Sequence, residues 1–326
     1  MPQSMPQSMH RPLLVVSLSA LALFCRARQA DAQTSPVSNQ NSSSYKLSVT
    51  VDEVTLTFHA ADIHGLPVND LKLSELKLLD NGKPPRRILT FDSLQDFPIR
   101  AGILMDTSES MNEHLSRNRA IAIQYAQHLL RQQTDQAFVM DFGYISRTVQ
   151  PWTGDPIALT YGIRKVTAGK ANPLGGTALY DTIFRACFSE FGKIDNAASG
   201  NFILLFSDGE DNASHTSLQE AVNICQHSNT AIYAFRAEPK LSFSSGPGTL
   251  VDLTSQTGGR VFHGDDSEAA IYSDLRAIEA DLRNQYRLIY NPAELKHDGS
   301  FRHIALRTPE RVDSINVRSG YYDLPY

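Results

Sequence analysis

The chain contains little cysteine. It has three cysteines in 326 residues, and Cys25 lies in a segment that we expect to be removed. Cys187 and Cys225 remain, and two cysteines are too few to define a disulfide scaffold. They could pair in an oxidising compartment. Both lie in helical patterns, however, where buried free cysteines are common. We therefore expect two unpaired thiols.

Strong charge of either sign is also absent. The formal net charge is -5 and the sequence pI is about 6.1, and no run of Lys or Arg occurs. This composition argues against a nucleic-acid partner. The ten His residues lack the H-x-x-x-H spacing of zinc sites, and the chain has neither a G-x-S-x-G elbow nor an H-E-x-x-H motif. These absences disfavour zinc chemistry and the common hydrolases.

The N-terminus has the order of a secretory signal peptide, which we predict to span residues 1–32. His10 and Arg11 precede an apolar stretch that ends at Cys25, and Ala30-Asp31-Ala32 offers a small-x-small cleavage site. The apolar stretch is short for a permanent membrane anchor. A lipoprotein site at Cys25 is the weaker alternative, because the bulky Phe24 precedes it. We expect an exported protein, periplasmic, at the cell surface or secreted, with no transmembrane span after cleavage.

A polar linker and a β segment follow. Residues 33–44 are mostly Ser, Asn, Gln and Thr, which predicts a disordered linker. From Tyr45 the apolar residues alternate with polar ones, as in half-buried strands. Residues 76–79 lead into Asp80-Asn81-Gly82, which predicts a hairpin turn. Residues 45–98 are therefore expected to form a small all-β segment.

Residues 99–284 alternate between strand and helix patterns, and most of the strands are continuous apolar runs. This arrangement is typical of a mostly parallel sheet covered on both faces, a Rossmann-like doubly wound α/β fold. The predicted strands are 100–105, 137–140, 148–151, 201–207, 231–235 and 260–262. The predicted helices are 115–130, 155–166, 178–192, 216–228, 250–257 and 267–284.

Residues 285–326 return to a β pattern, with apolar alternation at 286–290, 301–306 and 315–317. Each of the two flanking β segments is small for an independent domain. We therefore expect the segments at 45–98 and 285–326 to pair into a small β-sandwich, with the α/β domain inserted between them.

Three separate stretches place oxygen-bearing side chains where a strand gives way to a loop. The first is Asp106-Thr-Ser-Glu-Ser110, after an apolar strand; the second is Thr177, after Gly175-Gly176; the third is Asp208, after strand 201–207. In an open parallel sheet, ligands bind at the carboxyl ends of the strands. Carboxylates and hydroxyls suit a hard divalent cation, Mg²⁺ first and Mn²⁺ or Ca²⁺ after it.

Each stretch also has an ordinary structural explanation when taken alone. Asp106-Thr107-Ser108 is a common helix N-cap sequence, and Ser207-Asp208-Gly209 is an ordinary turn. Their order along the chain favours a shared site. We interpret Asp141, Glu210 and Asp211 as core-edge or loop carboxylates rather than ligands.

The combined pattern resembles the von Willebrand factor type A domain over roughly residues 98–280. The metal-ion-dependent adhesion site of that family matches Asp106, Ser108, Ser110, Thr177 and Asp208. Gly-Gly-Thr-Ala-Leu-Tyr-Asp at 175–181 and Ser-Asp-Gly at 207–209 agree in order and context. Glu109 stands where such domains usually carry Gly, although this is not a ligand position.

The resemblance implies a binding protein without catalytic residues. With only two carboxylates, Asp106 and Asp208, the bound cation would keep an open position, which in the family is filled by a Glu or Asp of the partner. By implication this chain binds a protein that presents such a residue. Gly175 and Gly176 would let the loop that carries Thr177 shift. The oligomeric state is not indicated.

Two alternatives remain. The chain could be an envelope assembly subunit that docks a partner through its flanking β unit by edge pairing. A metal-dependent hydrolase is less favoured, because no His lies at a motif position to activate Ser108 or Ser110. Replacement of Asp106 separates these readings, since edge docking would survive it.

Overall fold

The computed structural model describes residues 53–95, 98–128, 130–171, 175–193, 200–237, 245–263 and 267–324. Thr50–Tyr326 form one compact unit. The predicted signal peptide, the linker and the strand pattern at 45–51 lie outside the described residues. Within the described ranges, no helix combines the length and apolarity that a membrane crossing requires.

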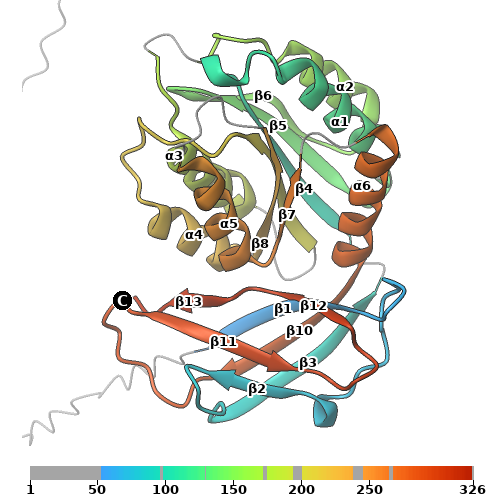
Figure 1. The fold of residues 1–326 in the computed structure, drawn as a ribbon, viewed down its shortest axis with the longest axis vertical. Helices are drawn as coiled ribbons and strands as arrows, with labels where there is room; N and C mark the ends of the chain where they lie inside the picture. Colours follow the sequence, from blue (N-terminus) through green and yellow to red (C-terminus); the bar gives the residue numbers. More distant parts are fainter. Residues whose placement is uncertain are drawn as a thin grey trace, which may run out of the picture. The chain divides into compact units, whose positions relative to one another are not determined.

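The α/β part is built on one six-stranded sheet (Figure 1) with the order β6-β5-β4-β7-β8-β9. All neighbouring strands are parallel except β5 and β6. The strand bounds are β4 (Ile99–Asp106), β5 (Gln136–Phe142), β6 (Ser146–Thr153), β7 (Gly200–Ser207), β8 (Thr230–Arg236) and β9 (Val261–His263). The mostly parallel, Rossmann-like sheet expected from the sequence is thereby confirmed.

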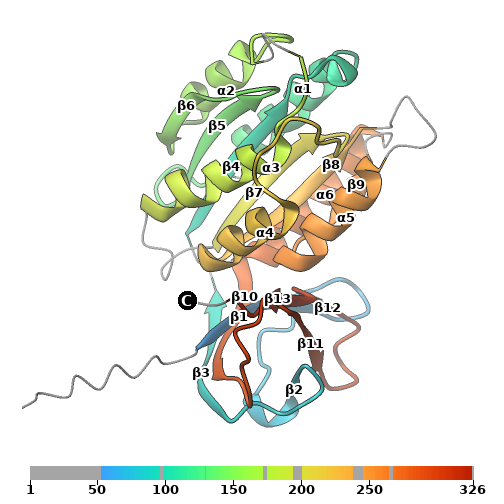
Figure 2. The same cartoon turned by 90° about the vertical axis from the view of Figure 1, so that its left-hand side faces the viewer.

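Helices cover both faces of this sheet, as Figures 1 and 2 show. Successive strand residues point to opposite faces. Ile103 belongs to the apolar cluster that includes residues of α1, α2 and α6, whereas Leu104 belongs to the cluster that includes residues of α3, α4 and α5. Both side chains are fully buried. The helix bounds are α1 (Leu115–His128), α2 (Pro156–Lys165), α3 (Leu179–Arg185), α4 (Leu218–His227), α5 (Gly246–Thr257) and α6 (Glu268–Arg283). Two covered faces explain why the strands are apolar throughout.

Local signals start and stop several helices. The Asp155 side chain accepts a hydrogen bond from the Ile157 N–H, and Pro156 occupies the first turn of α2. Ser217 and Glu220 form a capping box at the start of α4. The helix α5 ends at Gly258, whose φ of 88° lies in the left-handed region that glycine tolerates.

The predicted helix at 178–192 consists of three segments. The α-helix α3 stops at Arg185, a π-helical turn follows at Ala186–Glu190, and a 3-10 turn at Phe191–Lys193 ends the segment. A π-turn inserts an extra residue into the helical repeat and rotates the side chains beyond it. Here Phe191 is buried against the sheet, whereas Phe188 is 62% exposed.

The flanking β segments pair with each other in two sheets, ordered β12-β1-β10-β3 and β13-β11-β2. Strand β1 pairs with β10 and β12, and β2 pairs with β11, so both sheets mix the two flanks. Side chains of both sheets share one apolar cluster, which includes Leu56, Leu78 and Leu288. The bounds are β1 (Val54–Ala61), β2 (Lys77–Asp80), β3 (Arg87–Gln95), β10 (Asn284–Asn291), β11 (Phe301–Arg307), β12 (Ser314–Val317) and β13 (Gly320–Tyr322).

The hairpin expected at Asp80-Asn81-Gly82 was only half right. A tight turn forms there, with φ values of 49° at Asn81 and 79° at Gly82, and Asp80 and Lys83 exchange backbone hydrogen bonds. The following strand β3 nevertheless pairs with β10 in the other sheet. The turn therefore moves the chain from one sheet of the sandwich to the other. Strands β3 and β13 were not individually predicted.

Candidate metal centre

The candidate site lies at the carboxyl end of β4. From β4 the later strands of the chain are added in opposite directions, β5 and β6 on one side and β7, β8 and β9 on the other. Strand β4 is flanked by β5 on one side and β7 on the other, and both neighbours are parallel to it. Because Met105 pairs with Phe206, the next residues, Asp106 and Ser207, meet at the carboxyl edge of the sheet. The Ser207 hydroxyl donates to Asp106 Oδ2 over 2.8 Å. This edge is the usual ligand position of open α/β sheets.

The first predicted stretch turns back on itself after Asp106. The Ser108 N–H donates to Asp106 Oδ1 over 2.9 Å. The Ser108 and Ser110 hydroxyl oxygens lie 3.2 Å apart, so the structure brings these two side chains together. Ser108 precedes the 3-10 turn η2 (Glu109–Met111), yet its side chain makes no capping hydrogen bond. The N-cap explanation of this stretch therefore does not account for the Ser108 hydroxyl.

The other two stretches are joined through one loop. Asp208 is 4% exposed, and its Oδ1 accepts the Glu210 N–H over 3.1 Å. Thr177 is also 4% exposed. Its N–H donates to Asn212 Oδ1 over 2.8 Å, so Thr177 is attached to the loop that carries Asp208. Within the described part of the chain, no protein group forms a hydrogen bond with the Thr177 hydroxyl.

Asp208 lies close enough to Asp106 to affect the ionisation of Asp106. The pKa of Asp106 is raised to about 7, chiefly by burial and also by the charge of Asp208, against the opposing hydrogen bonds from Ser108 and Ser207. Neither carboxylate has a Lys, Arg or His partner among the described residues. A buried carboxylate pair of this kind is unfavourable unless protonated or joined by a cation.

The donor set fits a hard divalent cation. Two carboxylates and three hydroxyls are oxygen ligands of the kind that Mg²⁺, Mn²⁺ and Ca²⁺ accept. The described residues contain no cluster of three or more His, Cys, Asp and Glu side chains suited to a metal. Asp106, Ser108, Ser110, Thr177 and Asp208 are the residues that would hold the ion.

Neighbouring carboxylates have structural partners of their own. Asp141 is fully buried and bonds through Oδ1 to Arg147 Nε over 2.9 Å. Asp211 accepts the N–H of Tyr180 at the start of α3, and Glu210 accepts the N–H of Gly246. Sequence reasoning did not assign Asn212 to this site, since no local pattern indicates which residue will contact Thr177.

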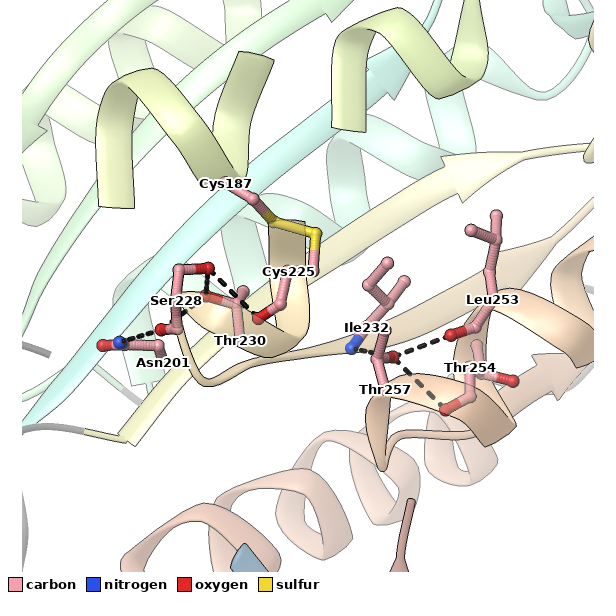
Figure 3. The surroundings of a disulfide bond; sticks show 9 residues. All are labelled: Cys187, Asn201, Cys225, Ser228, Thr230, Ile232, Leu253, Thr254 and Thr257. Carbon is pink, nitrogen blue, oxygen red and sulfur yellow. Dashed lines mark hydrogen bonds between the residues drawn. A yellow bond between two sulfur atoms is a disulfide. The ribbon is translucent and has the colours of Figure 1, made fainter. Parts of the chain in front are cut away.

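The expectation of free thiols was wrong, because Cys187 and Cys225 form a disulfide. Figure 3 shows it between the helical segment after α3 and the helix α4. Both cysteines are buried, at 1% and 0% exposure. Each lies on a helix face that packs on the same side of the sheet, which brings two residues far apart in sequence within bonding distance. Helical periodicity alone carries no information about that meeting.

Comparison with known proteins supports the family resemblance for the central part of the chain. A sequence profile described as the von Willebrand factor type A domain matches residues 102–210. This region resembles that domain. The match spans less than half of the chain, and it includes all five candidate ligands. No curated protein has a detectable match to this chain.

Similar solved structures include two from Bacteroides. The conserved hypothetical protein BatB from Bacteroides thetaiotaomicron is 17% identical, with a TM-score of 0.46, over 55% of this chain and 97% of that one. An aerotolerance-related membrane protein from Bacteroides fragilis is 16% identical, with a TM-score of 0.46, over 55% of this chain and 98% of that one. A third structure is that of proximal thread matrix protein 1 from the mussel byssus, with a zinc-occupied MIDAS motif. It is 16% identical, with a TM-score of 0.46, over 63% of this chain and 50% of that one.

Proposed function

We propose that this chain is a non-enzymatic binding module that uses a divalent cation to hold an acidic residue of a protein partner. The observation that carries the proposal is the convergence of Asp106, Ser108 and Ser110 with the Asp208 loop. They meet at the carboxyl end of β4, between β5 and β7. The match to the von Willebrand factor type A domain supports protein binding or adhesion as the general role. Asp106, Ser108, Ser110, Thr177 and Asp208 are the proposed ligands, with Mg²⁺ as the first candidate ion.

The number of charged ligands explains why such a site would bind a partner. Two carboxylates neutralise a divalent ion only formally, and the hydroxyls of Ser108, Ser110 and Thr177 add no charge. The ion therefore remains a strong attractor for one further anionic oxygen. A Glu or Asp of a second protein supplies that oxygen, and neighbouring contacts then provide the specificity.

We also propose that the protein works outside the cytoplasm, as the N-terminal sequence indicates. The disulfide between Cys187 and Cys225 supports this location, because disulfides persist in oxidising compartments and are rare in the cytosol. Periplasm, cell surface and secretion are all compatible with it.

The decisive experiment is a calorimetric titration of Mg²⁺ and Mn²⁺ into metal-stripped protein. We expect one site in the wild type and none in Asp106→Ala, with Thr177→Ala at least tenfold weaker. Circular dichroism of each variant should show a retained fold. Identical titrations of wild type and Asp106→Ala would exclude this metal centre.

A second candidate function is docking through the β-sandwich. The nine-residue strand β3 lies at the edge of its sheet, where β10 is its one partner among the described strands. An open sheet edge is a template for an added strand. In that case a captured partner would still bind Asp106→Ala and would not need a metal. Loss of partner binding in Asp106→Ala or in EDTA would favour the metal centre instead.

A further inference from the structure

The backbone of Thr177 is held almost entirely by the loop that follows β7. Its N–H donates to Asn212 Oδ1 over 2.8 Å. Its carbonyl accepts the N–H groups of Asn212, over 3.0 Å, and of Ala213, over 3.1 Å. Both hydrogen-bonding groups of one peptide residue are therefore fixed by neighbours four and five positions after Asp208. These hydrogen bonds connect Thr177 to the loop that also carries Asp208.

Gly176 permits this close contact. Its φ is 94°, and a Cβ atom at this position would come within 2.9 Å of Asn212 Oδ1 and 3.3 Å of the Ala213 Cβ. Any larger residue would be strained by its backbone conformation and would push the Asn212 side chain away. The Gly-Gly-Thr sequence therefore has a role besides loop mobility: it lets the Asn212 amide reach the Thr177 N–H.

A second set of bonds ties the same loop to the start of α3. Ser214 Oγ accepts the Asp181 N–H over 3.0 Å, and Asp181 in turn accepts the Thr216 N–H over 2.8 Å. Asp211 accepts the Tyr180 N–H over 3.0 Å. The bonds from the Tyr180 and Asp181 N–H groups satisfy donors of the first turn that a helix cannot bond internally. They hold the loop on α3 without touching Thr177, so they provide an internal control.

We propose that Asn212 is a positioning residue that sets the Thr177 hydroxyl relative to Asp208 in the cation site. This inference rests on the proposed function. The Asn212 side chain accepts the hydrogen bond of the Thr177 N–H, and the Asn212 N–H donates to the Thr177 carbonyl. The hydroxyl is the remaining polar group of Thr177. Without the Oδ1 acceptor a buried N–H would lose its partner, and the residue would move to find another. Asn212 thus acts through Thr177 and does not touch the ion.

The test is a calorimetric titration of Mn²⁺ and Mg²⁺ into metal-stripped wild type, Asn212→Ala, Asn212→Asp and the control Ser214→Ala. We expect Asn212→Ala to bind at least tenfold more weakly. Asn212→Asp keeps a carboxyl oxygen as acceptor and should bind at least as tightly as wild type. Ser214→Ala loses a loop-to-helix bond and should stay within threefold. Circular dichroism of each variant should show a retained fold.

A double mutant separates positioning from general loosening of the loop. If Asn212 acts through the Thr177 hydroxyl, adding Asn212→Ala to Thr177→Ala should cost no further affinity. Additive losses would overturn the inference, as would equal affinities of wild type and Asn212→Ala. Failure of the wild type to bind either ion would instead overturn the proposed function itself, together with this inference.

Discussion

At the scale of single residues, the candidate site depends on the balance between burial and charge. Asp106 is fully buried, Asp208 is 4% exposed, and Ser207, Ser108 and Glu210 supply hydrogen bonds to them. Those neutral bonds offset part of the cost of burying two acids, but they do not cancel the repulsion between them. A cation would do so, which links the ionisation of Asp106 to metal binding.

The first prediction concerns the metal-free protein. The pKa of Asp106 is about 7 in the fold, above the value of about 3.9 expected in an unfolded chain. The protonated form is therefore favoured by folding, so this contribution is complete below about pH 4 and is lost as the pH rises through about 7. In EDTA, the free energy of unfolding should fall over this range by up to about 4 kcal/mol.

Urea unfolding at pH 5 and pH 7.5 measures this effect. Asp106→Asn removes the titrating group, and it should flatten the pH dependence. Saturating Mg²⁺ should recover the lost stability of the wild type at pH 7.5, since the ion replaces the proton. The same slope in Asp106→Asn and wild type would show that other groups govern it.

At the scale of secondary-structure elements, the segment from α3 to α4 is fastened at two places. The bonds of Asp181, Asp211 and Ser214 hold the start of α3 on the loop after β7. Beyond the π-turn, the disulfide from Cys187 joins this segment to α4. The segment that follows Thr177 is therefore joined, at its start and beyond the π-turn, to the segment that follows Asp208.

The second prediction concerns the disulfide. It closes a loop with a sequence separation of 38, so it lowers the entropy of the unfolded chain by an amount equivalent to about 4 kcal/mol at 25 °C. Dithiothreitol should therefore lower the urea midpoint of the wild type strongly. The Cys187→Ser/Cys225→Ser double variant should start at that lower midpoint and should not respond to dithiothreitol. An unchanged wild-type midpoint after reduction, verified by thiol counting, would contradict this prediction.

At the scale of the whole molecule, the α/β part is an insertion between strands of the sandwich. The chain leaves the sandwich after β3 and returns through β10, which follows α6 without a gap and pairs with β3. A buried network then ties the two flanks together. Arg302 Nη2 lies 2.7 Å from Asp80 Oδ1. The hydroxyls of Tyr290 and Tyr321 donate to Asp80 Oδ2 over 2.8 and 2.7 Å.

The third prediction concerns this network. Asp80 is fully buried and Arg302 is 4% exposed, so removal of the carboxylate leaves a buried guanidinium without its counter-charge. Asp80→Ala should lower the free energy of unfolding by about 3–5 kcal/mol. Glu294→Ala, which breaks the exposed pair with Lys83, is the control and should leave the urea midpoint close to that of wild type, because exposed ion pairs contribute little to stability. Equal urea midpoints for the two variants would refute the role of Asp80.

Much of the architecture could be predicted before any contact was known. Apolar runs such as Ile99–Met105 and the helical spacing of α1 are local properties, so they predicted the alternating strands and helices and hence the parallel sheet. The motif around Asp106 also indicated the candidate ligands, because motif order along a parallel sheet places strand ends at one edge. The identity of those ligands stays a prediction until metal binding is measured.

Tertiary structure alone decided the remaining features. The pairing of β2 with β11, the Cys187–Cys225 disulfide and the contact of Asn212 with Thr177 each join residues that are well separated in sequence. Periodicity reports how a segment lies against a core, but it does not report which other segment lies opposite. That choice depends on the packing of the whole chain, since a side chain meets its distant partner only after the strands and helices between them have taken their places.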